Sequence, residues 1–306
     1  MFAQIYRHYL NSLAKIGPAE DVAVVPPDVD ALLPNMEGSP SSISDVEVDE
    51  QASVLGDKFR GIGVLVGILG ILIVFFAVAP TGLQVENENW LKIIGGIKVL
   101  LMCTLLVLVR LGSKSRLKDR WISIRREAER LRYEPMRKLT EELLQKDLPA
   151  HEAMKTSNDL REVMMKIAEG QVSYNQSKAI KYKAIERSSE RISWAGFIFA
   201  LLCALALLAS EFHWIPHYAW LIFGTAFTPA FVGGVHGINS FLNIGGLAEE
   251  HSKMSAILRK MCAELTLINP EDTEEMSRLA ERVYGQLVDR DTQWAEGARK
   301  VSLKPG

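Results

Sequence analysis

The sequence predicts an all-α membrane protein with two transmembrane helical hairpins, which make four spans, and long cytoplasmic helices. Three observations support this prediction. The apolar residues of the 306-residue chain are concentrated in blocks as long as a membrane span. Lysine and arginine gather in the segments between and after these blocks. Finally, no segment shows the alternation of apolar and polar residues that is typical of a half-buried strand.

Residues 1–55 are expected to form a mobile leader that begins with a short amphipathic helix. In "MFAQIYRHYLNSLAKI" the apolar residues recur at helical spacing, so this helix docks either on a partner, on the membrane surface or on its own chain. Residues 18–50 contain five prolines, the serine cluster "GSPSSIS" and an acidic excess. This composition disfavours a packed core.

The first hairpin is expected at residues 56–111. Its first span, "GIGVLVGILGILIVFFAVAP" at 61–80, carries no charge. At about 1.5 Å of helical rise per residue it reaches about 30 Å, the thickness of the hydrocarbon core. It begins far from Met1 and lacks a small-residue cleavage site, so we expect an anchor and not a removable signal peptide. The second span covers 91–111.

The second hairpin is expected at residues 193–246, with spans at 194–210 and at about 217–238. The alternative for each apolar run is a buried helix of a soluble core, which the long uncharged stretches disfavour. Gly63 with Gly67, and Gly233 with Gly237, give small faces at four-residue spacing. Such faces allow close helix packing, here expected within one bundle.

The remaining segments, 112–192 and 247–306, are expected to be cytoplasmic and helical. The first is divided into helices at about 114–146, with a bend near Pro135, and at 151–169 and 172–193, the last continuing into the third span. In the second, Asn269 is expected to cap a new helix. That helix has one apolar stripe, formed by Met276, Leu279, Ala280, Val283 and Leu287.

The distribution of basic residues predicts the orientation. Residues 110–138 contain eleven Lys or Arg against four Asp or Glu, whereas the hairpin connections "TGLQVENEN" and "EFHWIPHYA" contain no Lys or Arg. By the positive-inside rule, the segment between the hairpins is cytoplasmic. Both chain termini are then also expected in the cytoplasm.

Polar residues within or beside the spans are candidates for an ion path. An ammonium group such as that of Lys98 costs about 2.5–3.5 kcal/mol at the centre of the bilayer, so Lys98 either snorkels outward or faces the bundle or a wet path. His236, Asn239 and Asn243 lie at the cytoplasmic half of the fourth span. Asn239, Ser240 and Asn243, followed by the glycines at 245 and 246, mark either the inner mouth of a pore or a break between the membrane helix and a cytoplasmic helix.

The sequence contains none of the common catalytic or cofactor-binding motifs. It contains no phosphate-binding loop, dinucleotide fingerprint, zinc-protease motif or nucleophile elbow. The six histidines are scattered, and the three cysteines lack metal-like spacing. We therefore expect a protein that is not an enzyme, without catalytic residues, metal or cofactor. The net charge of −2 gives no indication of a nucleic-acid partner.

The stretch "RWISIRREAERLRYEP" follows the first hairpin closely. Trp121, Arg125, Ala128, Glu129 and Arg132 recur every three or four residues and therefore share one helix face. One interpretation is a solvated helix with arginines near anionic headgroups and the tryptophan packed on a neighbouring helix. The other is a specific joint to the C-terminal helices that transmits movement into the spans.

This stretch, together with the later "TQWAEGARKV", resembles the SLATT family, the SMODS- and SLOG-associating transmembrane effectors. The resemblance covers about residues 55–298, and its motif positions correspond to Trp121, Arg125, Ala128, Glu129 and Trp294. This chain differs from many members in having two predicted hairpins in place of one. Tyr133 stands nearest to the aromatic residue that usually follows the Ala-Glu pair.

The resemblance implies a bacterial defence or cell-suicide protein of the inner membrane that forms a pore, as a homo-oligomer, when a separately encoded sensor or a nucleotide signal triggers it. The residue pattern itself leaves two alternatives open. One is a structural scaffold that anchors a cytoplasmic complex to the bilayer, and the other is a small channel or transporter.

Overall fold

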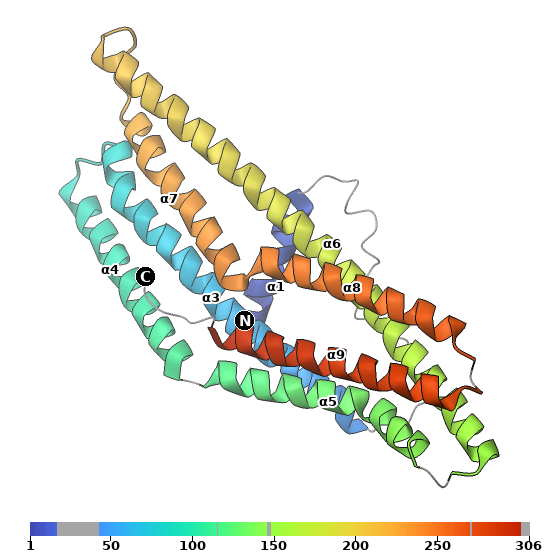
Figure 1. The fold of residues 1–306 in the computed structure, drawn as a ribbon. Coiled ribbons are helices and arrows are strands. Elements are labelled where there is room, and N and C mark those ends of the chain that lie inside the picture. Colours follow the sequence, from blue (N-terminus) through green and yellow to red (C-terminus); the bar gives the residue numbers. More distant parts are fainter. Residues whose placement is uncertain (17–42, 115, 146–147, 270, 301–306) are drawn as a thin grey trace.

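The computed structural model describes residues 1–16, 43–114, 116–145, 148–269 and 271–300 (Figure 1). Within these ranges every regular element is a helix and no strand occurs. The helices are α1 (Phe2–Ile16), α3 (Ile43–Gly82), α4 (Glu88–Lys114), α5 (Leu117–Leu143), α6 (Ala150–Glu211), α7 (Ala219–Leu242), α8 (Ile244–Leu267) and α9 (Thr273–Lys300).

Four of these helices contain segments long and apolar enough to cross a membrane, in α3, α4, α6 and α7. α3 and α4 form one antiparallel hairpin, and the end of α6 forms a second one with α7 (Figure 1). The predicted all-α fold with two hairpins and four membrane-length helices is therefore confirmed. The chain has the architecture of a multi-pass membrane protein.

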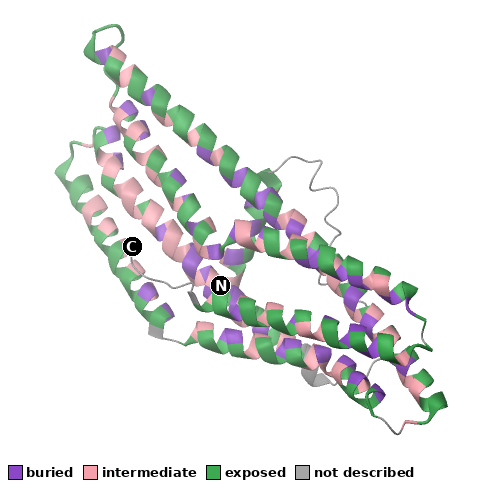
Figure 2. Cartoon of the chain, viewed as in Figure 1, coloured by how far each residue is buried: buried purple, intermediate pink, exposed green. Residues whose placement is uncertain are grey.

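The four spans lie in an open row. α4 packs on α3, α3 packs on α7, and α7 packs on α6, with α4 and α6 at opposite edges (Figure 1). Only 6% of the most apolar stretch of α4 is buried within the protein, and Figure 2 shows exposed residues along most of this helix. In a membrane, lipid covers this outward surface, because the apolar side chains there need no protein partner.

Below the spans, α5, α8, α9 and residues 150–190 of α6 form a second unit, here called the polar bundle. The four helices share one apolar core, in which α9 buries the stripe that the sequence predicted. The core residues are Tyr133, Met136, Leu143, Leu160, Met164, Ala168, Met254, Leu258, Met261, Leu265, Ile268, Met276, Leu279, Ala280, Val283 and Leu287. The polar bundle is thus a packed domain and not a set of separate solvated helices.

The N-terminal helix packs on its own chain. α1 buries Tyr6, Leu10 and Leu13 in a cluster with residues of α3, α6, α7 and α8, at the level where the spans meet the polar bundle. The Nε atom of Arg7 donates a hydrogen bond of 2.8 Å to Asp57 Oδ2 in α3. Of the three alternatives for this amphipathic helix, a partner, the membrane surface or its own chain, the structure shows packing on its own chain.

The leader predicted for residues 1–55 extended too far. Its central part, residues 17–42, lies outside the described residues, but α3 begins at Ile43 and the stretch up to residue 55 is helical. Ala52 is fully buried, and Leu55 packs against the cluster around Trp121. The acidic residues that suggested an unpacked leader include Asp49, which binds two arginines of α5.

Three predicted helix boundaries also differ. The helices expected at 151–169 and 172–193 are parts of one 62-residue helix, because Gly170 costs only about 1 kcal/mol in a helix interior and packing outweighs it. The helix expected at about 114–146 is α5, which begins only at Leu117, after Arg116 with a φ of 45°; Pro135 lies inside it, as expected. The carboxylate of Asp272, not the Asn269 side chain, accepts the capping bond from the Glu275 N–H at 2.9 Å.

Candidate functional site at the base of the spans

Trp121 is the centre of an aromatic cluster that joins three helices. Its ring stacks on Phe59 of α3, with centroids 6.0 Å apart, and meets Trp294 of α9 edge-to-face at 5.3 Å. α3 approaches closely here, since a Cβ atom on Gly56 would lie 2.6 Å from Trp121 Nε1. The contact with the C-terminal helix, which one of the two interpretations of this stretch requires, therefore exists. We call the cluster of Gly56, Phe59, Trp121 and Trp294 the tryptophan joint.

Arg60 connects the tryptophan joint to the N-terminal helix. Its guanidinium carbon lies 4.8 Å from the centroid of Trp121 and 5.5 Å from that of Tyr6. Such cation–π contacts contribute about 0.5–2 kcal/mol, with the larger values where water is excluded. α1, α3, α5 and α9 are thus held together at one level of the molecule.

Glu129 lies eight residues after Trp121 in α5 and is almost fully buried, with 3% of its side chain exposed. It forms an ion pair with Arg125 and accepts a hydrogen bond of 2.6 Å from Arg132 Nη1. Asp49 Oδ1 of α3 receives further bonds, 2.8 Å from Arg125 Nη1 and 3.2 Å from Arg132 Nη2. We call these four residues the carboxylate cluster; it fastens α5 to the first turns of α3.

Burial and neighbouring charges shift the pKa of two carboxyl groups in this region. Burial alone would raise the pKa of Glu129, but the charges of Arg132, Arg125 and Arg290 outweigh this effect and lower the pKa to about 2. The carboxyl group of Asp291 in α9 behaves in the opposite way. Burial, followed by the negative charge of Glu129, raises its pKa to about 6. Glu129 is therefore ionised at neutral pH. Asp291 of α9 contributes a second carboxyl group, which takes up a proton more readily than Glu129 does.

The polar residues predicted near the membrane separate into two groups. His236 Nε2 lies 2.8 Å from Ser193 Oγ, and the amide of Asn239 donates to Ser189 Oγ at 2.6 Å, so both hold α7 to α6. Tyr9 of α1 also donates to Asn239 Oδ1 at 2.8 Å. His236 and Asn239, which the sequence suggested as pore residues, therefore form contacts between helices within one chain.

Asn243 and Lys98 lie elsewhere. Asn243 is exposed at the junction of α7 and α8 with a φ of 53°, and it therefore marks a break between two helices. Lys98 is half-buried on α4, at the edge of the row and away from α7. The structure does not bring Lys98 together with His236 and Asn239.

Only one of the two predicted glycine faces mediates packing. A Cβ on Gly63 would lie 1.9 Å from Phe241, and one on Gly67 would lie 2.3 Å from Ile238, so α3 touches α7 through these glycines. Cβ atoms on Gly233 and Gly237 would meet no atom of the described residues within 4 Å. The prediction for Gly233 and Gly237 is wrong, because the neighbouring Gly234 points to α3 in their place.

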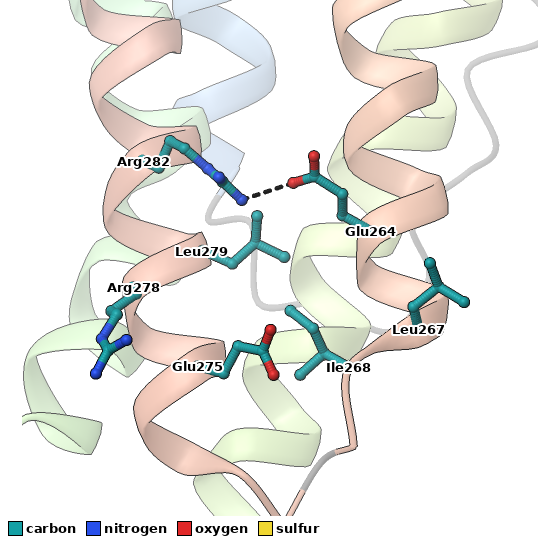
Figure 3. A pocket seen from close by; sticks show the side chains of 7 residues that line it. All are labelled: Glu264, Leu267, Ile268, Glu275, Arg278, Leu279 and Arg282. Carbon is teal, nitrogen blue, oxygen red and sulfur yellow. Dashed lines mark hydrogen bonds and ion pairs between the residues drawn. The ribbon is translucent and has the colours of Figure 1, made fainter.

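One hollow of the described structure lies far from the tryptophan joint. About 510 Å³ in volume, it lies between the end of α8 and the start of α9 (Figure 3). Figure 3 shows Arg282 reaching across it to Glu264, a contact of 2.6 Å. It is lined by Glu264, Leu267, Ile268, Glu275, Arg278, Leu279 and Arg282. Among the described residues, no group of three or more His, Cys, Asp or Glu is placed to hold a metal ion.

Comparisons with protein-family models, with curated proteins and with solved structures found no match. The geometry of the tryptophan joint and the carboxylate cluster therefore carries the functional argument.

The sequence indicates Trp121 and Trp294, which are in contact, and Arg125 and Glu129, which form an ion pair, but it does not indicate their partners. Asp49 lies in the segment expected to be the leader, and Gly56 and Arg60 lie just before the first predicted span. A signal was present: Asp49, Ala52, Gly56 and Phe59 follow each other at three- or four-residue spacing and define one helix face.

Proposed function

We propose that this chain is a membrane effector of a bacterial defence or cell-suicide system. In this proposal the polar bundle receives a signal from a separately encoded sensor or from a nucleotide, and the spans then permeabilise the inner membrane. The observation that carries it is the tryptophan joint. Trp121 contacts both α9, which belongs wholly to the polar bundle, and α3, which continues as a span.

Two long helices support a mechanical link between the parts. α3 and α6 each run without a break from the level of the polar bundle into a membrane-length segment. A helix is stiff over such lengths, so a shift of α5 and α9 on the inner part of α3 also shifts its span. The ion pairs between Asp49 and the α5 arginines are positioned to transmit this shift.

The pore of this proposal forms between copies of the chain. Among the described residues the four spans lie in one row, and the apolar stretches of its two edge helices, α4 and α6, are largely exposed. Several rows placed edge to edge would surround a path. The concentration of basic residues in the polar bundle, together with α1 and α9 lying at that same end, supports a cytoplasmic location for both termini.

Replacing Trp121 or Trp294 with alanine is expected to reduce depolarisation of bacterial cells by about tenfold after induction. The reason is that each change removes an aromatic contact between α5 and α9, worth about 0.5–1.5 kcal/mol beyond the buried area. Trp294→Phe should keep most of the activity because a ring remains. The readout is a potential-sensitive dye, compared at equal protein content of the membrane.

The control is Trp214→Ala, since Trp214 is exposed between α6 and α7, far from the joint. Full depolarisation by both Trp121→Ala and Trp294→Ala would contradict the proposed coupling.

A structural scaffold is the second candidate, and the continuous core of the polar bundle favours it, because a packed four-helix domain offers a stable platform. A steady membrane potential while wild-type protein accumulates in the membrane would support the scaffold over the effector. A channel within one chain is less well supported, since α3 lies between Lys98 on α4 and Asn239 on α7.

A further inference from the structure

The charges of α5 change character along its length. The part next to the membrane, residues 117–126, contains four basic residues and one acidic residue. The remainder, residues 127–143, contains four basic and five acidic residues. The same helix is thus strongly basic where it leaves α4 and balanced further away.

The ion pairs of the arginines also differ between the two parts of α5. In the distal part, Arg130 binds Glu127 at 2.6 Å and Arg137 binds Glu134 at 2.7 Å. At the membrane end, Arg116, Arg120 and Arg126 are exposed, and none of them forms an ion pair within the described part of the chain. Three exposed guanidinium groups therefore have no carboxylate partner among the described residues.

A small hollow lies on this basic side. It has a volume of about 240 Å³ and is lined by Asp119, Ile122, Ser123, Arg126 and Arg299. The end of α9 is held there by a 2.7 Å hydrogen bond from Lys118 Nζ to the carbonyl oxygen of Arg299. Two guanidinium groups and a hydroxyl donor outnumber the one carboxylate, so the hollow suits a phosphate-sized anion.

The position of this surface matches the height of lipid headgroups. The apolar run of α4 ends at Leu111, and α5 leaves the end of α4 at an angle (Figure 1). At about 1.5 Å per residue, Arg126 lies at most about 15 Å beyond Arg116 along α5, and less in depth because of this angle. The field of an anionic leaflet decays over about 8–10 Å. Arg116 and Arg120 therefore lie closest to this field and Arg126 at its outer edge, whereas the paired Arg130 and Arg137 lie further along α5.

We propose that the start of α5 and the end of α9 form a docking surface for the phosphate headgroups of anionic phospholipids. Arg126 and Arg299 hold one phosphate in the hollow, and Arg116 and Arg120 contact neighbouring headgroups. The source is the bilayer and not free phosphate, because α4 fixes the surface beside a leaflet that presents headgroups at high local density. This inference does not depend on the effector proposal.

Binding is measured with the full chain in a neutral detergent, titrated with phosphatidylglycerol or with phosphatidylcholine, by native mass spectrometry of lipid adducts and by thermal unfolding. The wild-type chain should bind phosphatidylglycerol at least tenfold more tightly. Each arginine near a charged leaflet contributes about a fivefold gain in affinity, so Arg120→Ala with Arg126→Ala should weaken phosphatidylglycerol binding about thirtyfold.

The matched control is Arg130→Ala with Arg137→Ala, which removes two arginines of the same helix that already have partners and should leave lipid binding within about twofold. Equal binding of the two lipids, or unchanged binding by the Arg120/Arg126 double variant, would overturn the proposal. An equal stabilisation by inorganic phosphate would also overturn it, because the source would then be soluble. The adduct count reports binding even if the unfolding midpoint of a variant shifts.

Discussion

Replacing Glu129 with alanine is expected to destabilise the polar bundle by about 3–5 kcal/mol, because it leaves the charges of Arg125 and Arg132 without their buried partner. Both arginine side chains are less than one-third exposed, so water compensates them only in part. Asp49 remains as a second partner, which places the expected loss toward the lower end of this range. Thermal unfolding of the purified full chain, followed by tryptophan fluorescence, measures the effect.

The control for Glu129 is Glu127→Ala in the same turn of α5. Glu127 is exposed and pairs with the exposed Arg130, and such surface pairs contribute little. Its unfolding midpoint should therefore stay close to that of the wild-type chain. Equal midpoints for the Glu129 and Glu127 variants would show that the carboxylate cluster does not hold α5 to α3.

Replacing Gly63 with leucine should separate α3 from α7 and prevent normal assembly of the spans. Even a Cβ atom at this position would lie 1.9 Å from the ring of Phe241, and the backbones cannot approach as observed once a side chain is present. Overpacking in a well-packed interior typically costs about 1–3 kcal/mol, and a leucine exceeds what a ring rotation can accommodate. The expected readouts are a lower unfolding midpoint and a loss of monodispersity in size-exclusion chromatography.

Gly233→Leu gives the matched control, since the same substitution on α7 meets open space. A normal elution profile is expected for this variant. If Gly63→Leu also eluted and unfolded like the wild-type chain, the close contact between α3 and α7 would be incorrect.

The sequence predicts the four spans well because their signal is local. An uncharged run as long as 61–80 is rare in the helices of soluble proteins, so it indicates a span. The basic segment between the two hairpins separates them clearly. The motif face of Trp121, Arg125 and Glu129 is also a local pattern. Its contact with Trp294 agrees with one of the two interpretations of this stretch, the joint to the C-terminal helices.

The features that sequence reasoning missed depend on tertiary partners. Gly233 with Gly237 has the same spacing as Gly63 with Gly67, and only the neighbouring helix decides which pair is covered. Gly170 resembles a helix end until the packing of α6 is known. Asp49 looks like part of an acidic leader until Arg125 and Arg132 are placed beside it. These are cases in which tertiary contacts override local composition.

The central claim is that four helices span the membrane and leave the polar bundle on one side. Single cysteines at Glu86 and at His151, in a chain whose native Cys103, Cys203 and Cys262 are replaced, test it with a membrane-impermeant maleimide on intact spheroplasts. Glu86 lies between α3 and α4, and His151 lies in the first turn of α6. The account predicts labelling of Glu86→Cys from outside and of His151→Cys only after the membrane is opened. Labelling of both positions from the same side would contradict it.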